Sequence, residues 1–428
     1  MALLVQKFGG TSLADIAKIQ HAAKIVAKTK AAGHDVVVIV SAMAGETDRL
    51  IALANAMQKS PTPREYAALV ATGEQVTMAL MAMALKEINL EAISFTGAQA
   101  GIHTCNMAKK ARIKFIEKER ILSELKCGKV VVVAGFQGVD DDGNTTTLGR
   151  GGSDTSAVAV AAALNASECQ IFTDVEGVFT TDPNIVKEAK LLESISFEEM
   201  LELASLGSKV LQIRSVEFAG KYNVPLRVLS SQVKGRGTLI TYNQREDMES
   251  PLVSGIAFSR QESKITLSGA KDPLKTISTL LSELKDLGVN IDMLMQANLP
   301  ENTKEIMFTL HQDEHDTTLQ HLISKRAILN VQEISGASNF AKLSLVGAGL
   351  KSHPSVIATL FQTLTEHTIP VELMSMSEIK ISVIITADKL EEAVRVLHRN
   401  FNLDKEVDAA KEGKAPYLDE TFVVYSEN

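Results

Sequence analysis

Near its start the chain reads Leu3-Leu-Val-Gln-Lys-Phe8, a mostly apolar run that Gly9-Gly10-Thr11-Ser12 interrupts. Residues 13–32 then carry apolar side chains at helical spacing, and Val36-Val-Val-Ile-Val40 is a continuous β-branched run. Such a run is typical of a strand that is buried on both faces of a parallel sheet. This strand–helix–strand order predicts a layered α/β fold with a mainly parallel sheet in the first half of the chain.

Composition narrows the classes of function. The chain has 428 residues, which predicts two or three domains. Aromatic residues make up 4% and Trp is absent, so a stacking platform for single-stranded nucleic acid is not expected. The formal net charge of −8 argues against broad attraction to DNA or to an anionic membrane. An anionic substrate would therefore need a local cationic pocket.

The cysteines and the apolar segments indicate where the protein works. Cys105, Cys127 and Cys169 have no paired spacing and are expected to be free thiols in a reducing compartment. We find neither a signal peptide nor an apolar segment long enough to span a bilayer. We therefore expect a cytoplasmic protein without a membrane partner.

The second half of the chain repeats itself after a change of composition near residues 236–250. Residues 264–269 (KITLSG) align with residues 342–347 (KLSLVG), and each copy continues with a proline, an amphipathic helix and a strand carrying an acid, Asp292 or Glu372. Each copy reads β-α-β-β-α-β, the ferredoxin-like order. We expect one large domain over residues 1–245, followed by two small α+β domains over residues 262–337 and 340–428.

Two glycine loops in the first domain each stand between a strand and a helix. The first contains Lys7, Gly9 and Gly10, and the second is Leu148-Gly-Arg-Gly-Gly-Ser-Asp154. Glycines let backbone N–H groups approach an anion, and a helix N-terminus adds unpaired donors. Each loop alone also fits an ordinary tight turn, but two of them make anion binding the better interpretation.

A third segment, Thr173-Asp-Val-Glu-Gly-Val-Phe179, follows another strand. An acid at a strand end suits ribose, adenine or a magnesium shell, although Glu-Gly and Asp-Pro also form plain turns. Lys209 is a further candidate phosphate contact or a solvated lysine. No P-loop and no protein-kinase signature is present in the sequence.

Taken in order, these motifs resemble the amino acid kinase family, and the full set is similar to the aspartokinases. The resemblance rests on KFGGTS at the start, GRGGSD at 149–154 and TDVEGVFTTDP at 173–183, with supporting stretches around Ser41, Glu74 and Lys209. The second half resembles paired ACT domains, notably over residues 344–354. The similarity covers nearly the whole chain and implies transfer of the γ-phosphoryl group of ATP to the side-chain carboxylate of L-aspartate.

The resemblance also implies roles for individual residues. The catalytic residues are Lys7 and Asp154. The aspartate-binding residues are Ser41, Thr47, Glu74, Arg150, Gly151, Gly152 and Ser153. The nucleotide-binding residues are Lys7, Phe8, Gly9, Gly10, Thr173, Asp174, Phe179, Asn184 and Lys209. ATP and Mg²⁺ are the implied cofactors, and we assign no protein side chain as a metal ligand.

The implied chemistry makes physical sense. A side-chain carboxylate has a pKa near 4 and is ionised at neutral pH, so it needs no general base. Catalysis then consists of positioning and of neutralising charge. Two positions depart from the family pattern: Phe179 stands where Tyr is common, and Asn184 where Arg is common. They place nucleotide affinity and base preference in question.

The ACT resemblance implies feedback control by lysine, threonine or both, and a homo-oligomer joined through these domains. The candidate effector contacts are Asp272, Ile291, Asp292, Gln296, Val371, Glu372, Met374 and Ser375. Internal initiation at Met248 would yield a separate regulatory subunit. The alternatives are a kinase for glutamate or N-acetylglutamate, and a non-catalytic amino-acid sensor.

Overall fold

The computed structural model describes residues 2–205, 210–242, 252–298 and 304–405. They form two compact units. The first is built from residues within Met1–Phe179 and Leu191–Met248, and the second from residues within Thr180–Lys190 and Glu249–Lys405. Each unit has its own sheet and its own hydrophobic core.

The first unit is organised around an eight-stranded sheet in the order β10-β12-β11-β9-β1-β2-β6-β3. Its strands are β1 (Leu3–Phe8), β2 (Asp35–Val40), β3 (Ala92–Phe95), β6 (Val130–Ala134), β9 (Glu168–Thr173), β10 (Ser194–Ser196), β11 (Leu226–Ser230) and β12 (Thr238–Thr241). All neighbouring pairs are parallel except β11 and β12. The mainly parallel α/β fold expected from the β-branched runs is confirmed.

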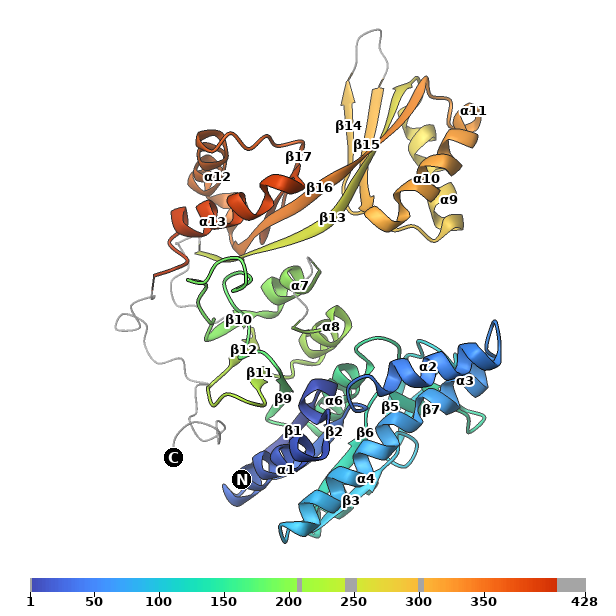
Figure 1. The fold of residues 1–428 in the computed structure, drawn as a ribbon, viewed down its shortest axis with the longest axis vertical. Helices are drawn as coiled ribbons and strands as arrows, with labels where there is room; N and C mark the ends of the chain where they lie inside the picture. The colour runs from blue at the N-terminus through green and yellow to red at the C-terminus, as the bar shows by residue number, and fades with distance from the viewer. Residues whose placement is uncertain (1, 206–209, 243–251, 299–303, 406–428) are drawn as a thin grey trace. The chain divides into compact units, whose positions relative to one another are not determined.

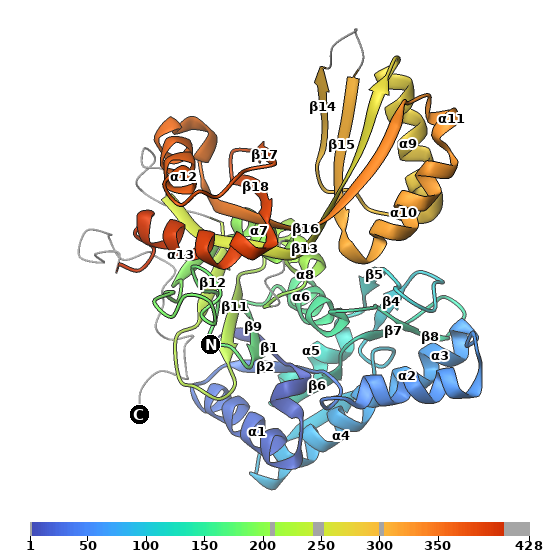
Figure 2. The ribbon, with the colours of Figure 1, turned by 45° about the horizontal axis from the view of Figure 1, so that its top comes forward.

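Helices cover this sheet in layers (Figures 1 and 2). The helices are α1 (Ile16–Ala31), α2 (Glu46–Met57), α3 (Pro63–Val70), α4 (Thr72–Glu87), α5 (Glu119–Lys126), α6 (Gly152–Leu164), α7 (Phe197–Ser205) and α8 (Ile213–Tyr222). Apolar side chains of α1 and α4 form one core with Phe8, Val38 and Phe172. Because successive side chains of a strand point to opposite faces, Lys7 points to the other face, where α6 packs.

Contrary to our expectation that no apolar segment is long enough to span a bilayer, the helical stretch Pro63–Glu87, which comprises α3 and α4, is long and apolar enough to do so by length and composition. Its residues Met81, Ala82 and Leu85 are buried in the core against the sheet. We therefore interpret the stretch as core helices of the first unit.

A smaller four-stranded sheet accompanies the first one, in the order β5-β4-β7-β8. Its strands are β4 (Ile102–Thr104), β5 (Ile113–Ile116), β7 (Gln137–Val139) and β8 (Thr145–Thr147). Thr104 and Thr146 lie fully buried in it, with their hydroxyl oxygens 2.7 Å apart.

The second unit contains one antiparallel six-stranded sheet in the order β14-β15-β13-β16-β18-β17. The strands are β13 (Leu252–Ala270), β14 (Leu294–Asn298), β15 (Lys304–His311), β16 (Glu333–Ala348), β17 (Leu373–Met376) and β18 (Lys380–Thr386). The helices α9 (Pro273–Leu287), α10 (Gln312–Ser324) and α11 (Arg326–Leu329) cover one half, and α12 (Pro354–Glu366) and α13 (Leu390–Asn400) the other.

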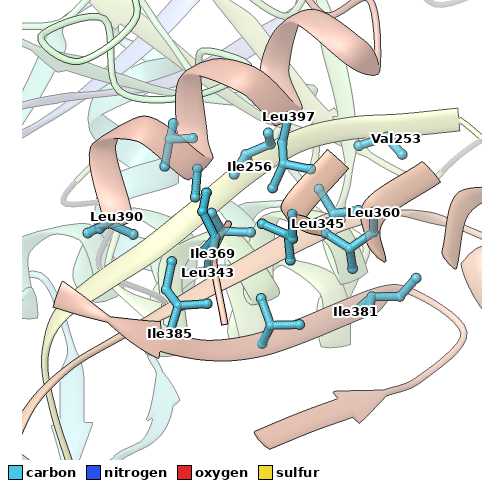
Figure 3. Close-up of a cluster of buried hydrophobic side chains, with 14 of the residues drawn as sticks. Val253, Ile256, Leu343, Leu345, Leu360, Ile369, Ile381, Ile385, Leu390 and Leu397 are labelled. Carbon is cyan, nitrogen blue, oxygen red and sulfur yellow. The ribbon is translucent and has the colours of Figure 1, made fainter. Parts of the chain in front are cut away.

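The two repeats share strands, which the repeat pattern did not predict. Over residues 262–337 the elements follow the expected β-α-β-β-α-β order. The second repeat pairs its first strand with the start of β13, through Gly255↔Val346 and Ala257↔Ser344. Val253 and Ile256 accordingly lie in the second repeat's core (Figure 3). The start of β13, which precedes residue 262, thus completes the sheet of the second repeat. Residues 406–428 of the expected second small domain lie outside the described residues.

Residues 180–190 also fall elsewhere than we expected. We placed them in the large domain, but they belong to the second unit, where Val186 is buried in the core and the Thr180 carbonyl accepts from the Ile256 N–H at 2.7 Å. Their turn-forming sequence carried no signal for this distant strand contact.

Candidate active site

The parallel strands of the first unit end in register at one edge of the sheet. Phe8 is level with Val40 on one side and with Phe172 on the other, and Thr173 is level with Ser230. The first glycine loop, Ser41 and Asp174 therefore follow strand ends that lie side by side. The carboxyl edge of a parallel α/β sheet is the usual place for a ligand.

The first glycine loop is held tightly against its neighbours. The Gly9 N–H donates to the Phe172 carbonyl at 3.1 Å. A Cβ at position 10 would lie 3.0 Å from the Ala42 carbonyl oxygen, so a larger residue would push the backbones apart. Glycine at position 10 therefore permits the loop to pack against the end of β2.

A buried ion pair lies beside this loop. The Lys7 Nζ is 2.5 Å from the Asp154 Oδ1, and both side chains are almost completely buried. A Cβ at position 9 would lie 3.4 Å from the Lys7 Nζ, which places the ammonium next to the loop backbone. Asp154 lies in the first turn of α6, where the helix dipole favours a carboxylate.

The second glycine loop leads into α6. Gly151 is the N-cap residue with φ of +68°, and a Cβ there would overlap the side chain of Gln212. Gly152 and Ser153 are buried, and a Cβ at position 135 would lie 2.9 Å from that of Ser153. The Arg150 side chain is exposed and makes no hydrogen bond or ion pair with any residue that the structure describes.

Glu74 is a buried carboxylate with one unused oxygen. It lies in the first turn of α4 with 4% of its surface exposed, and its Oε1 accepts from the Ala42 N–H at 3.2 Å. Its Oε2 is buried without a hydrogen-bond partner among the described residues. Burial raises the pKa of Glu74 to about 7. A ligand ammonium would give this oxygen a partner and favour its charged form.

The other expected substrate contacts stand near the same strand end. The Ser41 N–H donates to the Phe8 carbonyl at 3.1 Å, and the Ser41 side chain is half-buried. Thr47 is half-buried in the first turn of α2, which begins after Gly45. The structure thus brings Ser41 and Glu74 to the strand end that contacts the first loop.

The expected nucleotide contacts are only partly assembled. The Thr173 Oγ1 donates to the Asp174 Oδ1 at 3.1 Å, and Asp174 is exposed at the end of β9. Phe179 is half-buried and forms an isolated antiparallel bridge with Leu191. Lys209 lies outside the described residues.

The remaining nucleotide candidate, Asn184, lies in the segment 180–190. It belongs to the second unit, where its backbone N–H and its Nδ2 both donate to the Asp182 Oδ1 at 2.9 Å.

Sequence patterns missed four residues that support the loops. Gln212 packs against Gly151, and the Arg214 guanidinium donates to the carbonyls of Leu148 and Ala111 at 2.8 and 2.9 Å. Ser12 and Ser231 share a hydrogen bond at 2.7 Å. Ser12 stood within the first motif, whereas the other three had no local signal because their partners are distant in sequence.

Two ion pairs connect the two repeats of the second unit. Lys264 of the first repeat lies 2.7 Å from the Glu372 Oε2 of the second, and Lys342 of the second pairs with Asp292 of the first. Asp292 and Glu372 occupy equivalent positions, since their N–H groups donate to the Thr309 and Ile384 carbonyls of the neighbouring strand. The alignment of the repeats in sequence is therefore also a spatial equivalence.

The remaining effector candidates are spread over the second unit. Asp272 caps α9 by accepting from the Lys275 N–H at 3.2 Å. Ile291, Val371 and Met374 are partly buried against the cores. Gln296 is exposed on the edge strand β14, and Ser375 is half-buried on the opposite edge strand β17.

Within the described part of the chain, no three His, Cys, Asp or Glu side chains are grouped so as to hold a metal ion. All three cysteines are free, and only Cys169 is buried.

Comparison with known proteins identifies the family. Residues 2–230 match the model of the amino acid kinase family, and residues 343–401 match that of the ACT domain. An aspartokinase of Pseudomonas aeruginosa is 52% identical over 405 residues, covering 94% of this chain and 98% of the relative.

Solved structures agree with this match. Aspartokinase III of Escherichia coli, in complex with aspartate and ADP, superimposes with a TM-score of 0.73 at 25% identity, covering 93% of this chain and 99% of the other. Its complex with lysine and aspartate gives a TM-score of 0.74 at 25% identity and the same coverage. The chain therefore belongs to the amino acid kinase family, as one of its aspartokinases.

Proposed function

We propose that the carboxyl edge of the first sheet transfers the γ-phosphoryl group of ATP to the side-chain carboxylate of L-aspartate, giving 4-phospho-L-aspartate and ADP. The chain is a feedback-regulated aspartate kinase. The observation that carries the site assignment is the buried Lys7–Asp154 pair beside the first glycine loop, at the same edge as the half-partnered Glu74. The aspartate and ADP bound to the E. coli relative support the same pair of ligands here.

The nucleotide is held by the first loop and by the end of β9. Phe8, Gly9 and Gly10 present backbone to the phosphates, and Lys7 adds a positive charge that the phosphates need. Thr173 and Asp174 contact the nucleoside, with Phe179 and Lys209 as further contacts. Mg²⁺ enters with ATP, since it usually keeps several waters and binds the phosphates of the nucleotide, and we assign no side chain of this chain as its ligand.

L-aspartate is recognised by its charges. The exposed Arg150 has the planar fork that suits the α-carboxylate, assisted by Gly151, Gly152 and Ser153. Glu74 binds the α-ammonium with its unused Oε2. Ser41 and Thr47 donate hydroxyl hydrogen bonds to the bound amino acid.

The reaction requires little proton chemistry. The side-chain carboxylate of the substrate is already ionised, so an oxygen of it attacks the γ-phosphorus directly while the bond to the ADP oxygen breaks. The main barrier is the approach of two anions. Lys7 and the loop N–H groups offset the charge on the transferred group, and Asp154 fixes the Lys7 ammonium in place.

Regulation acts through the second unit. The E. coli relative has been solved with lysine bound, and we propose lysine, threonine or both as effectors of this chain. Asp292 and Glu372 are carboxylates that now face lysine side chains of the other repeat, so each already stands where a cationic group is bound. An effector with an ammonium group meets the same requirement, with Asp272, Ile291, Gln296, Val371, Met374 and Ser375 as the other contacts.

We also propose a cytoplasmic homo-oligomer joined through the ACT domains. Initiation at Met248, which lies outside the described residues, would add a separate regulatory subunit. Native mass spectrometry of the chain expressed from its own gene tests both ideas. A monomer without any smaller product would contradict them.

The decisive test of the function is ADP release with MgATP and L-aspartate, repeated with L-glutamate and N-acetylglutamate. We expect release with aspartate, suppressed by lysine or threonine. Release with another acid alone would reassign the substrate pocket. Absence of release with all three acids would favour a sensor that uses only the ACT domains.

A further inference from the structure

Three strand ends at the nucleotide edge are joined by side-chain hydrogen bonds that strand pairing does not require. Strand β9 lies between β1 and β11, and all three run parallel. Ser12 follows β1, in the short 3-10 helix Gly10–Leu13, and Ser231 follows β11 directly. The two serines come from opposite sides of β9 and meet beyond its end.

The hydrogen bonds have a defined direction. The Ser12 Oγ donates to the Ser231 Oγ at 2.7 Å and lies 3.5 Å from the Phe172 carbonyl. The Ser231 Oγ donates in turn to the Thr173 carbonyl at 3.1 Å, which also accepts from the Ser231 N–H at 2.8 Å. Each hydroxyl has one hydrogen to donate, so the hydrogen bonds run from Ser12 through Ser231 to the Thr173 carbonyl.

Both serines are shielded from water. Ser12 is 3% exposed and Ser231 is 4% exposed. Removal of one hydroxyl would deprive the other of one of its hydrogen bonds in a place where water does not readily replace it. The relative position of the two serines is therefore fixed more firmly than a surface hydrogen bond would fix it.

The ends of this chain of hydrogen bonds are the two halves of the proposed nucleotide site. Ser12 follows Gly9 and Gly10, which we assign to the phosphates. The Thr173 carbonyl belongs to the residue that, with Asp174, we assign to the nucleoside. ATP must contact both segments at once, so its binding depends on the distance between them.

We propose that Ser12 and Ser231 are positioning residues that set the spacing between the phosphate-binding loop and the nucleoside-binding segment. This inference rests on the proposed function of the edge. Neither serine touches the reacting atoms. Their effect is on the affinity for the nucleotide, and the aspartate pocket around Glu74 and Arg150 is unaffected.

The test compares Ser12→Ala, Ser231→Ala and the double variant in the full-length protein. We expect each single change to raise the KM for ATP and the Kd for ADP by about three- to tenfold, the equivalent of one hydrogen bond. The double variant should bind the nucleotide no more weakly than the more impaired single variant, because both changes break the same chain of hydrogen bonds. The KM for aspartate should stay within about twofold.

A matched control separates positioning from stability. Thr104 and Thr146 form a second buried hydroxyl pair, also 2.7 Å apart, in the smaller sheet of the same unit. Thr104→Val removes that hydrogen bond without touching the nucleotide edge. It should lower Tm by an amount comparable to Ser12→Ala and leave the Kd for ADP unchanged.

The outcomes separate cleanly. An unchanged Kd for ADP in Ser12→Ala, or an equal weakening in Thr104→Val, would overturn the proposal. If Ser231→Ala does not fold, Ser12→Ala decides alone, since it lies at the start of the chain of hydrogen bonds. If the unmodified protein binds ADP but does not phosphorylate aspartate, the proposed function fails while the ADP titrations still decide the role of the serines.

Discussion

Glu74 and Glu168 are two carboxylates of the first unit that are buried to the same extent, with 4% of each residue exposed. The Arg227 guanidinium donates to both oxygens of Glu168 at 2.9 Å, and Gln170 Nε2 donates to its Oε1 at 2.9 Å. Glu74 accepts from the Ala42 N–H with its Oε1, and its Oε2 has no hydrogen-bond partner in the described structure.

The difference shows that burial does not by itself identify a functional acid. A buried carboxylate whose partners are all supplied by the fold contributes to the structure, and its pair must be kept intact. A buried carboxylate with an unused oxygen is destabilising until a ligand supplies the missing charge. The number of partners therefore separates the two roles, and each of the following experiments tests that separation.

The largest expected effect is on stability at Glu168. Arg227→Met leaves the Glu168 carboxylate buried without its cation and should lower the free energy of unfolding by about 3–5 kcal/mol. Urea unfolding followed by circular dichroism measures it. Glu168→Gln combined with Arg227→Met removes both charges and should recover much of the loss. A loss below about 1 kcal/mol for the single variant would mean that the pair is not structural.

At Glu74 the larger effect should be on the substrate. Glu74→Gln removes the charge that we assign to the α-ammonium, so the KM for aspartate should rise by about 30- to 150-fold, equivalent to about 2–3 kcal/mol. Steady-state kinetics at about pH 8, where Glu74 is ionised, measures it. The KM for ATP is the internal control. An equal rise in both constants would show that the change disturbs the whole edge.

The pH dependence of stability tests the state of Glu74 without any assumption about substrate. Burial raises its pKa from 4.5 to about 7, so between these values the folded protein holds a proton that the unfolded chain has released. The wild-type protein should therefore lose about 1.4 kcal/mol per pH unit relative to Glu74→Gln as the pH rises through this window. Thermal unfolding of both proteins at several pH values measures the difference, and parallel curves would contradict the shifted pKa.

The smallest effects on the free energy of unfolding are expected at the two ion pairs that connect the repeats of the second unit. The side chains of Asp292 and Glu372 are 39% and 35% exposed, so water can replace a lost lysine. Lys264→Met and Lys342→Met should each change the free energy of unfolding by no more than about 1 kcal/mol. Lys342→Met should be the costlier, since that lysine is 7% exposed against 18% for Lys264. A loss as large as that of Arg227→Met would mean that these ion pairs contribute to stability as strongly as the Glu168–Arg227 pair.

Much of the site could be predicted from the sequence because its functional residues lie close together in the chain. Lys7 with Gly9 and Gly10, and Arg150 with Asp154, each stand within a few residues of a strand end or a helix start. Parallel strands place such ends along one edge, so the motifs predicted a common site without any knowledge of the contacts.

The residues that contact and support those motifs could not be predicted from the sequence. Ser231 stabilises a loop that lies 219 positions earlier in the chain, and Arg227 reaches Glu168 from a neighbouring strand. Glu74 was named from the family pattern, but nothing in its local sequence showed that one oxygen is buried and unused. These properties depend on which backbone approaches from a distance.

The sequence by itself determined the alternation of strands and helices, the two glycine loops and the repeat in the second half, because hydrophobic period and backbone freedom are properties of neighbouring residues. Only the tertiary structure decided that the start of β13 completes the second repeat, that lysines and acids are exchanged between the repeats, and that Glu74 and Glu168 differ in their partners. The physical reason is that strand pairing and the satisfaction of buried charge are settled between segments far apart in the chain.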